Sequence, residues 1–389
     1  MFRRRFWFAQ LVAIAALCAG LPVAEAGTVI TRELVAFDKL PGWSDDNHAE
    51  ALRAFRQSCA MPAGAGAADT VAGLMKICAL ALKLSASNVS DRRSARAFFE
   101  ANFQPFRLHG DQPDGLLTGY FEPELEGSLK PDSRFHVPVL RRPGDLVDIV
   151  PANERAAANA AGKLASMRKT EGGLVPYFTR AEIEAGALNG RSLDLVYLDN
   201  EVDAYLMHVQ GSGSIRLGDG RVMRIGYAGK NGYPFTSAGS VLIREGAIKR
   251  EDLTMQSMRA WLEAHPKQAK RVLQENKSYI FFEEKALAAD ATGPIGGQGT
   301  PLMPRRSLAV DPNYYVLGGP VYVVSDGLLT DGKQPFRHLL IAQDVGSAIK
   351  GPERGDIFWG TGKAAGEIAG RTKHRGNVYA LLPLGTGQP

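Results

Sequence analysis

The chain has 389 residues, of which 45% are hydrophobic and 22% are charged, and its formal net charge is +5 at pH 7. This composition is typical of a globular protein with enough apolar material for a core, and it excludes a low-complexity chain. The positive excess is too small to indicate nucleic acid as a partner. The length favours two domains.

The amino terminus predicts export. Residues 1–26 contain three arginines, an apolar run and an Ala-Glu-Ala sequence ending at Ala26, an order typical of a secretory signal peptide with a small-residue cleavage site. Lipid attachment would use Cys18, but the leucine before it is larger than the residue that such a site usually has. No other apolar run reaches the roughly 18 residues that span a bilayer, so we expect a soluble, exported protein.

Cleavage would leave two cysteines, Cys59 and Cys78. An even pair in an oxidising compartment favours a disulfide, which would add on the order of 3 kcal/mol by closing a loop of about 20 residues. Two buried free thiols are the alternative. Two cysteines without nearby histidines do not make a structural zinc site, and we expect neither a metal nor a cofactor.

The first third of the mature chain predicts helices. Residues 45–59 begin with side chains that can cap a helix, and their apolar residues recur at helical spacing. Residues 71–86 continue in the same way. A third helix is expected in residues 90–106, opened by Ser90 or Asp91 and closed before a proline. We expect these helices to pack against a core.

From Leu116 onward the sequence predicts short strands separated by glycine and proline. Asp219 and Gly220 are expected to form the turn of a hairpin. Two further helices are expected in residues 179–188 and 253–276. The predicted strands lie in residues 116–128, 138–150, 192–198, 204–229, 308–311, 320–327, 338–344 and 377–383.

This alternation predicts a mainly β fold with flanking helices (α+β) and a barrel-like assembly, rather than a doubly wound α/β sheet. The glycine-rich residues 293–302 lack the lysine and the strand–glycine–helix order of a phosphate-binding loop. We therefore reject a nucleotide site there.

Three aspartates, Asp311, Asp344 and Asp356, lie where predicted strands meet loops. Each of them alone fits a turn acid. A proton donor must keep its carboxylic form near neutral pH, so it needs surroundings that raise its pKa. Asp356 precedes three large apolar residues and fits this role better than Asp344, which could orient groups or hold Asp356 protonated by like-charge repulsion.

Other motifs are weaker. Ser347 and Lys350 match an S-x-x-K pattern, but its partner motifs are absent from the sequence. Asp344-Val-Gly resembles an aspartic-protease loop without a second copy. The seven histidines are scattered with no metal-like cluster, and His208 is expected to be a strand histidine.

Polar side chains in residues 208–220 could bind a sugar. Gln210, Ser212 and Ser214 are expected at a strand end, near Tyr227 and Tyr233. Amide and hydroxyl groups beside tyrosines suit the hydroxyl and N-acetyl groups of a saccharide. Ordinary hairpin chemistry is the alternative.

Taken together, these stretches resemble the membrane-bound lytic murein transglycosylase A family, whose carboxyl-terminal part is a three-aspartate domain. In the most specific stretch, residues 342–370, two aspartates stand in an ordered setting of glycines around Lys350. The other stretches that carry the resemblance are residues 116–128, 177–183, 196–220, 225–237 and 296–323.

The resemblance implies two domains around a groove, a double-psi β-barrel formed by both ends of the chain and an inserted smaller β domain. The expected divisions are a signal peptide at 1–26, a helical start with the first part of the barrel at 27–125, the inserted domain at 126–275, and the rest of the barrel at 276–389. It also implies cleavage of the β-1,4 bond between N-acetylmuramic acid and N-acetylglucosamine in peptidoglycan without water, leaving a 1,6-anhydromuramic end.

The resemblance implies a role for each matching residue. Asp356 would be the general acid and then the general base, with Asp344 and Asp311 supporting it. The expected substrate contacts are Gln210, Ser212, Lys350, Thr118, Gly119 and Tyr120. Lys350 could instead stabilise the ionised carboxylate.

The expected partner is the peptidoglycan glycan strand, with other cell-wall enzymes as candidate protein partners, and we expect a monomer. The expected location is the periplasm. Members of this family are often lipid-anchored to the outer membrane, which the poor lipid-attachment sequence of this chain does not support.

Two rival functions stay open. A hydrolytic muramidase would use Asp344 and Asp356 with water, and it requires its carboxyl groups about 5–5.5 Å or about 6.5–9.5 Å apart. A non-catalytic wall-binding module on the same barrel would bind peptidoglycan without cleaving it.

Overall fold

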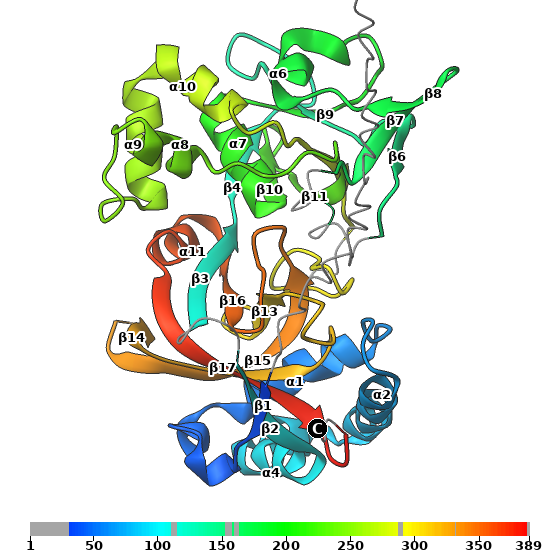
Figure 1. The fold of residues 1–389 in the computed structure, drawn as a ribbon, viewed down its shortest axis with the longest axis vertical. Coiled ribbons are helices and arrows are strands. Elements are labelled where there is room, and N and C mark those ends of the chain that lie inside the picture. The colour runs from blue at the N-terminus through cyan, green and yellow to red at the C-terminus, as the bar shows by residue number, and fades with distance from the viewer. Residues whose placement is uncertain are drawn as a thin grey trace, which may run out of the picture.

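The computed structural model describes residues 31–109, 115–151, 158, 163–286, 291–330 and 332–386. The predicted signal peptide and Cys18 lie outside these ranges. The described chain forms two bodies, one above the other in Figure 1. The lower body holds both coloured ends of the chain, and the upper body holds its middle.

A closed ring of six strands forms the centre of the lower body. Its order is β17-β14-β15-β13-β16-β3, and β3 pairs back with β17. The pairs β13–β15 and β16–β3 are parallel. The expected mainly β fold with a barrel is therefore confirmed. The strands are β3 (Gly115–Glu122), β13 (Ser307–Val310), β14 (Pro320–Thr330), β15 (Gln334–Val345), β16 (Arg354–Thr361) and β17 (Lys373–Pro383).

Helices from the start of the chain pack on the outside of this barrel, and β2 and β1 extend its sheet from β17. Phe55 and Phe99 are fully buried in one cluster with Leu339 and Ile341 of β15. Cys59 and Cys78 form a disulfide between α1 and α2. The elements are β1 (Thr31–Leu34), α1 (His48–Cys59), α2 (Ala68–Lys83), α3 (Ala86–Ser90), α4 (Arg92–Asn102) and β2 (Phe103–His109).

Three small sheets build the upper body: β12-β11-β10-β4, β5-β9 and β6-β7-β8. The predicted hairpin is confirmed, since β10 and β11 are antiparallel on either side of the Asp219–Gly220 turn. The strands are β4 (Glu124–Gly127), β5 (Val137–Leu140), β6 (Leu146–Asp148), β7 (Ser166–Thr170), β8 (Gly173–Pro176), β9 (Asp194–Leu198), β10 (Ser212–Leu217), β11 (Val222–Lys230) and β12 (Ile280–Glu284).

The helices of the upper body lie beside these sheets. The predicted helix at 179–188 is a short α-helix that continues into a π-helical turn, and the one at 253–276 is two helices that meet at His265 and Pro266. The helices are α6 (Arg180–Glu182), the π-helical turn (Ile183–Ala187), α7 (Glu201–Gln210), α8 (Ala238–Arg244), α9 (Met255–Ala264) and α10 (Pro266–Gln274).

The strand expected at residues 204–210 was wrong, because this segment belongs to helix α7. The Asn200 side chain accepts a hydrogen bond from the Asp203 backbone and caps the helix, and Gly211 ends it with a φ of 79°. His208 is therefore a helix residue. The helices α8 and α11 (Gly362–Ala369) were not expected, and neither was α3 as a separate helix.

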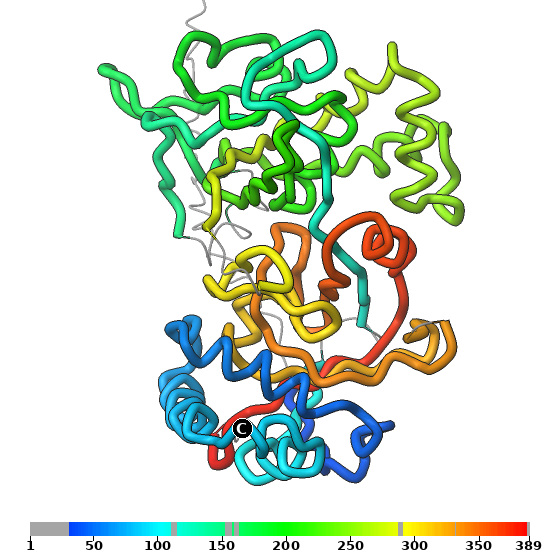
Figure 2. Tube along the Cα trace, turned by 180° about the vertical axis from the view of Figure 1, so that it is seen from behind, coloured from blue at the N-terminus to red at the C-terminus, as the bar shows by residue number. Residues whose placement is uncertain are grey.

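The chain passes from the lower to the upper body between β3 and β4, which are separated by Pro123 alone. Figure 2, which views the molecule from behind, shows this link as the cyan segment that runs between the two bodies. Within the described ranges, none of the helices combines the length and apolar character that crossing a membrane requires.

Candidate functional site

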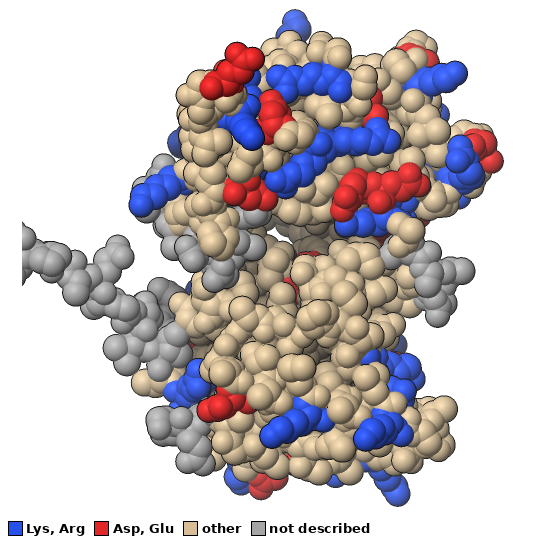
Figure 3. All heavy atoms as spheres, turned by 90° about the vertical axis from the view of Figure 1, so that its right-hand side faces the viewer, with Lys and Arg blue, Asp and Glu red and all other residues tan. Residues whose placement is uncertain are grey.

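A hollow of about 180 Å³ lies where the two bodies meet, and we call it the interbody hollow. Seen from the right-hand side of Figure 1, the surface is indented at this junction (Figure 3). Its wall from the upper body is Arg180, His208, Val209, Lys230, Phe235, Asn276, Ser278 and Ile280, and its wall from the barrel is Gly346, Ser347, Ala348, Ile349, Arg354 and Asp356.

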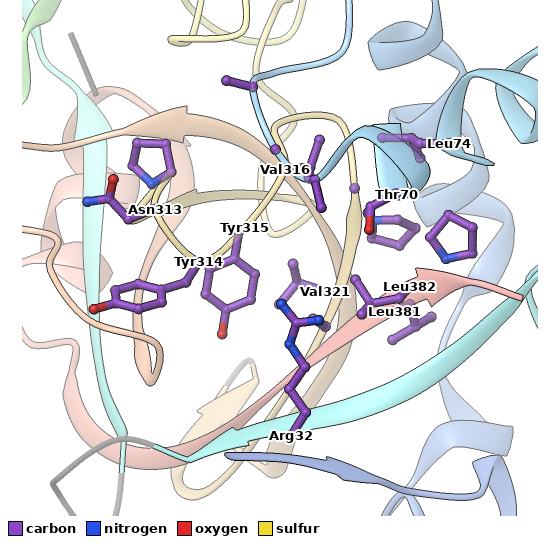
Figure 4. Close-up of a pocket in the computed structure, with 18 residues that line it drawn as sticks. Arg32, Thr70, Leu74, Asn313, Tyr314, Tyr315, Val316, Val321, Leu381 and Leu382 are labelled. Atoms are coloured by element: carbon purple, nitrogen blue, oxygen red, sulfur yellow. The ribbon is translucent and has the colours of Figure 1, made fainter. Parts of the chain in front are cut away.

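A second hollow, of about 100 Å³, lies between the barrel and α2. Figure 4 shows Tyr314, Tyr315 and Arg32 around it, with Leu381 and Leu382 from β17. No carboxylate is among its described lining residues. Among the described lining residues, the interbody hollow has a carboxylic acid and this one does not.

Strand register brings Asp344 and Asp356 to one side of the barrel sheet. Ala309, on the strand between them, pairs with Asp344 of β15 on one side and with Asp356 of β16 on the other. Residues in register on neighbouring strands project to the same side. With strands spaced about 4.8 Å apart, the two aspartate backbones lie about 10 Å apart.

A β-bulge is required for this arrangement. The β13–β15 register shifts between Leu308 and Ala309, so that Leu308 pairs with Ala342 and the next residue pairs with Asp344. In a regular strand with no bulge at Gln343, alternation would turn Asp344 to the same side as Ala342, whose side chain lies in the barrel core. The bulge re-aims the carboxylate.

Asp356 is half-buried and has few stabilising partners for a carboxylate in that position. The Thr118 hydroxyl donates to its Oδ1, and Arg354 Nη2 donates to that hydroxyl at 2.8 Å. Burial raises the pKa of Asp356 to about 6, against the lowering effects of Arg354 and Thr118, and the charge of Asp344 raises it further. The group therefore retains a protonated fraction near neutral pH.

Asp344 accepts three hydrogen bonds. Tyr120 Oη donates at 2.8 Å, and the backbone amides of Gly297 and Val345 donate at 2.8 and 2.9 Å. Burial raises the pKa of Asp344, and these three donors oppose the rise. Burial, the charge of Asp344, the hydrogen bond to that carboxylate and the charge of Asp356 all raise the pKa of Tyr120.

Asp311 lies apart from this pair. It is 2% exposed and accepts a hydrogen bond from the Gly351 amide at 2.9 Å, with Lys350 Nζ at 3.9 Å from its Oδ1. These contacts fix the loop that leads from β15 into β16. Asp311 and Lys350 therefore hold in place the segment that precedes Asp356.

Three other predicted substrate contacts, Gln210, Ser212 and Gly119, lie near the point where the chain passes between the bodies. Gln210 accepts a hydrogen bond from the Phe121 amide at 3.1 Å, and Ser212 is buried at the start of β10. A Cβ at Gly119 would lie 2.5 Å from Trp359 Nε1, which explains a glycine there. None of the six predicted substrate contacts is among the described lining residues of the interbody hollow.

Arg354 and the pair Arg180 and His208 line the hollow and were missed by the sequence analysis. For Arg354 a signal was available, because it precedes Asp356 by two residues and strand side chains alternate with period two. Among the described residues, no group of three or more His, Cys, Asp or Glu side chains is placed to hold a metal ion.

Comparisons with known proteins agree with this architecture. A family model described as the MltA specific insert domain matches residues 116–283, and one described as the 3D domain matches residues 306–382. Membrane-bound lytic murein transglycosylase A of Vibrio cholerae is 35% identical over 286 residues, which cover 72% of this chain and 68% of the Vibrio protein. The Escherichia coli K12 protein of the same name is 34% identical over 299 residues, covering 75% of this chain and 72% of its own.

Solved structures give the same result. A membrane-bound lytic murein transglycosylase from Agrobacterium tumefaciens superposes with a TM-score of 0.81 at 36% identity, covering 91% of this chain and 98% of the other. Escherichia coli MltA with bound chitohexaose has a TM-score of 0.65 at 28% identity, covering 92% and 96%. Matched along most of its length in both sequence and fold, the chain belongs to the membrane-bound lytic murein transglycosylase A family.

Proposed function

We propose that this protein is a peptidoglycan lytic transglycosylase. It cleaves the β-1,4 bond between N-acetylmuramic acid and N-acetylglucosamine without water and leaves a 1,6-anhydromuramic end. One observation carries the proposal: the Asp356 carboxyl lines the interbody hollow, and its pKa is raised to about 6. The chitohexaose bound to the Escherichia coli relative supports a glycan as the substrate.

Asp356 performs both proton transfers. In its protonated form it donates to the glycosidic oxygen as the bond to muramic C1 breaks, which releases the N-acetylglucosamine end as an alcohol. As a carboxylate it then takes the proton from the muramic C6 hydroxyl while O6 bonds to C1. Atoms and protons balance without water, and the enzyme returns to its starting state.

The neighbours of Asp356 adjust its proton affinity. General acid–base help contributes about 10²–10⁴-fold, and the acid must be protonated before the bond breaks. Asp344 favours that state by its charge, while the charge of Arg354 and the hydrogen bond from Thr118 stabilise the carboxylate that follows. The opposing effects keep both protonation states accessible in one catalytic cycle. Asp311 and Lys350 support the loop before Asp356.

Location and domain limits are also proposals. The signal-like residues 1–26 and the disulfide support export to the periplasm, and the named relatives are membrane-bound. Sheet membership supports a change of domain between β3 and β4, near residue 125. Strand β12 pairs with β11 of the upper body and so belongs to the inserted domain. This pairing favours an inserted domain that ends after Glu284, later than the expected residue 275.

Mass spectrometry of muropeptides tests the reaction. Purified peptidoglycan is digested with wild-type protein and with Asp356→Ala, and products are analysed for anhydromuramic and reducing ends. We expect anhydro ends from the wild type and a loss of at least about 10²-fold in their rate of formation in the variant.

The same experiment separates the rivals. Reducing muramic ends from the wild type would indicate the hydrolase and overturn the lytic reaction. Binding of peptidoglycan with no product from either protein would indicate a wall-binding module. Anhydro products from Asp356→Ala at the wild-type rate would overturn the role of that residue.

A further inference from the structure

Arg180 and His208 form a buried pair in the wall of the interbody hollow, away from the acids of the barrel. Arg180 is 2% exposed and His208 is 6% exposed. Arg180 donates to the backbone oxygens of Asn276 at 3.2 Å and Ser278 at 2.8 Å, and to Glu184 Oε1 at 3.2 Å. Its guanidinium is thereby fixed in place.

The contact between the pair determines where the histidine carries its proton. Arg180 Nη2 lies 3.1 Å from His208 Nδ1. A guanidinium has only donors, so Nδ1 must be the unprotonated nitrogen that accepts. The imidazole is therefore the tautomer with its proton on Nε2. Burial and the charge of Arg180 hold the pKa of His208 well below its ordinary value, which keeps the ring neutral.

The Nε2–H group remains available. The ring is held by edge contact with Tyr279, with centroids 4.5 Å apart, and by Phe282 at 5.3 Å. Within the described residues no side chain or carbonyl accepts a hydrogen bond from Nε2, and this atom is not among the fully buried polar atoms that lack a partner. His208 lines the hollow, so an Nε2–H group without a partner in the described chain is free to meet a ligand there.

The surroundings indicate what this donor binds. Val209, Phe235 and Ile280 supply apolar surface to the same wall of the hollow. A neutral N–H donor beside apolar side chains matches an acetamido group, whose carbonyl oxygen accepts and whose methyl group is apolar. The same wall also contains the cationic side chains Arg180 and Lys230, so the ring is the neutral donor among them.

We propose that His208 is a substrate-binding residue, whose Nε2–H donates to the carbonyl oxygen of an N-acetyl group of the glycan strand. This inference rests on the proposed function, because it assigns part of the same substrate. Arg180 is the positioning residue, which sets the tautomer and the ring orientation.

Two substitutions separate this role from a structural one. In His208→Gln the amide nitrogen takes the place of Nε2 but the acceptor for Arg180 is lost. In His208→Asn the amide oxygen takes the place of Nδ1 and accepts from Arg180, but the donor to the sugar is lost. Both are made in an Asp356→Asn background to prevent turnover, and their binding of chitohexaose is measured by calorimetry with thermal unfolding as the second readout.

We expect His208→Asn to weaken binding by about 5–10-fold, the effect of one neutral hydrogen bond, while His208→Gln stays within about twofold. Thermal stability should be lower in His208→Gln than in His208→Asn, because only His208→Asn keeps the acceptor for Arg180. In the otherwise wild-type enzyme, His208→Asn should raise KM with little change in kcat. With the fully de-N-acetylated hexamer the difference between the variants should disappear.

Wild-type affinity in His208→Asn, or an equal loss in both variants, would overturn the role of Nε2. These outcomes are independent of the proposed function, because the wild-type enzyme is assayed for anhydro ends in parallel. If those ends form while His208→Asn binds normally, only this inference fails. If the wild type forms none, the proposed function fails.

Discussion

Two aspartates beside arginines, the buried Asp46 in the lower body and the half-buried Asp356 at the interbody hollow, have opposite proton affinities. The pKa of Asp46 is held far below its ordinary value, whereas that of Asp356 is raised to about 6. Burial raises the pKa in both cases. The difference lies in how many donors each carboxylate has.

Asp46 receives a full set of hydrogen bonds. Arg306 donates to both of its oxygens at 2.9 Å, His338 Nδ1 lies at 2.8 Å, and the Leu339 and Asn47 amides both donate at 2.7 Å. Such bonds favour the ionised form and outweigh desolvation. The carboxylate stays charged and ties the start of α1 to β13 and β15.

Within the described residues, Asp356 accepts one hydrogen bond, from Thr118, and Arg354 acts on it by its charge and by donating to that hydroxyl. Asp344 adds a like charge nearby. The comparison teaches that the same two side-chain types yield a permanent ionic contact or a proton donor, according to the number of bonds that the backbone and its neighbours supply.

The largest expected effect is on the rate. Asp356→Asn should reduce formation of anhydro ends by about 10²–10⁴-fold without lowering the free energy of unfolding, because it removes a carboxylate that burial disfavours. Product analysis and urea unfolding at pH 7 check both parts. A large loss of stability would mean that Asp356 belongs with Asp46 as a structural acid.

For Asp46 we expect a loss of stability rather than a direct effect on the rate. Asp46→Asn leaves the buried Arg306 with Glu50 as its remaining acid, so we expect the free energy of unfolding to fall by about 3 kcal/mol, the low end for breaking a buried ion pair. Asp326→Asn is the matched control, because this aspartate is 80% exposed in its pair with Arg337. It should change stability by less than about 1 kcal/mol.

The pH dependence should distinguish the two acids in one protein. Asp356 must be protonated to act as the acid, so kcat/KM should fall about tenfold per pH unit above its pKa of about 6. Its raised pKa favours folding most below the ordinary value of 3.8, and that contribution is lost as pH rises through about 6. Asp46 has a lowered pKa, so its contribution is present above 3.8 and is lost as pH falls below it.

A smaller shift is expected from Arg354→Gln. The charge of Arg354 lowers the pKa of Asp356, so its removal should move the alkaline fall of kcat/KM upward by about one pH unit. Arg354→Lys keeps the charge and should shift it less. An unchanged profile in Arg354→Gln would show that the arginine does not act on this acid.

Much of the fold and the position of the acid could be predicted from the sequence, but not the reason for the acid's pKa. The apolar residues after Asp356 suggested the raised pKa, yet Ile357 and Trp359 point into the barrel core by strand alternation. Phe358 alternates to the side of Asp356 and packs against Tyr120. Segments far apart in sequence also cover the acid, such as β3, whose Thr118 pairs with Asp356.

Two other features depended on tertiary structure. The bulge at Gln343 shifts register by one residue, and no local pattern shows which side of the sheet Asp344 then faces. In α7 the β-prone residues around His208 suggested a strand, although Asn200 and Gly211 marked the ends of a helix. The capping residues were the better signal.

The pairing of β3 with β16 has a consequence for the newly made chain. Thr118 and Asp356 are 238 positions apart, and the last strand of the ring, β17, closes on β3 only after Asp356 has been made. Any chain that stops short of its final segment lacks the closed ring that buries this carboxyl. We therefore expect a partly synthesised or partly exported polypeptide to be inactive on the wall, so that the capacity for damage would arise only when synthesis is complete.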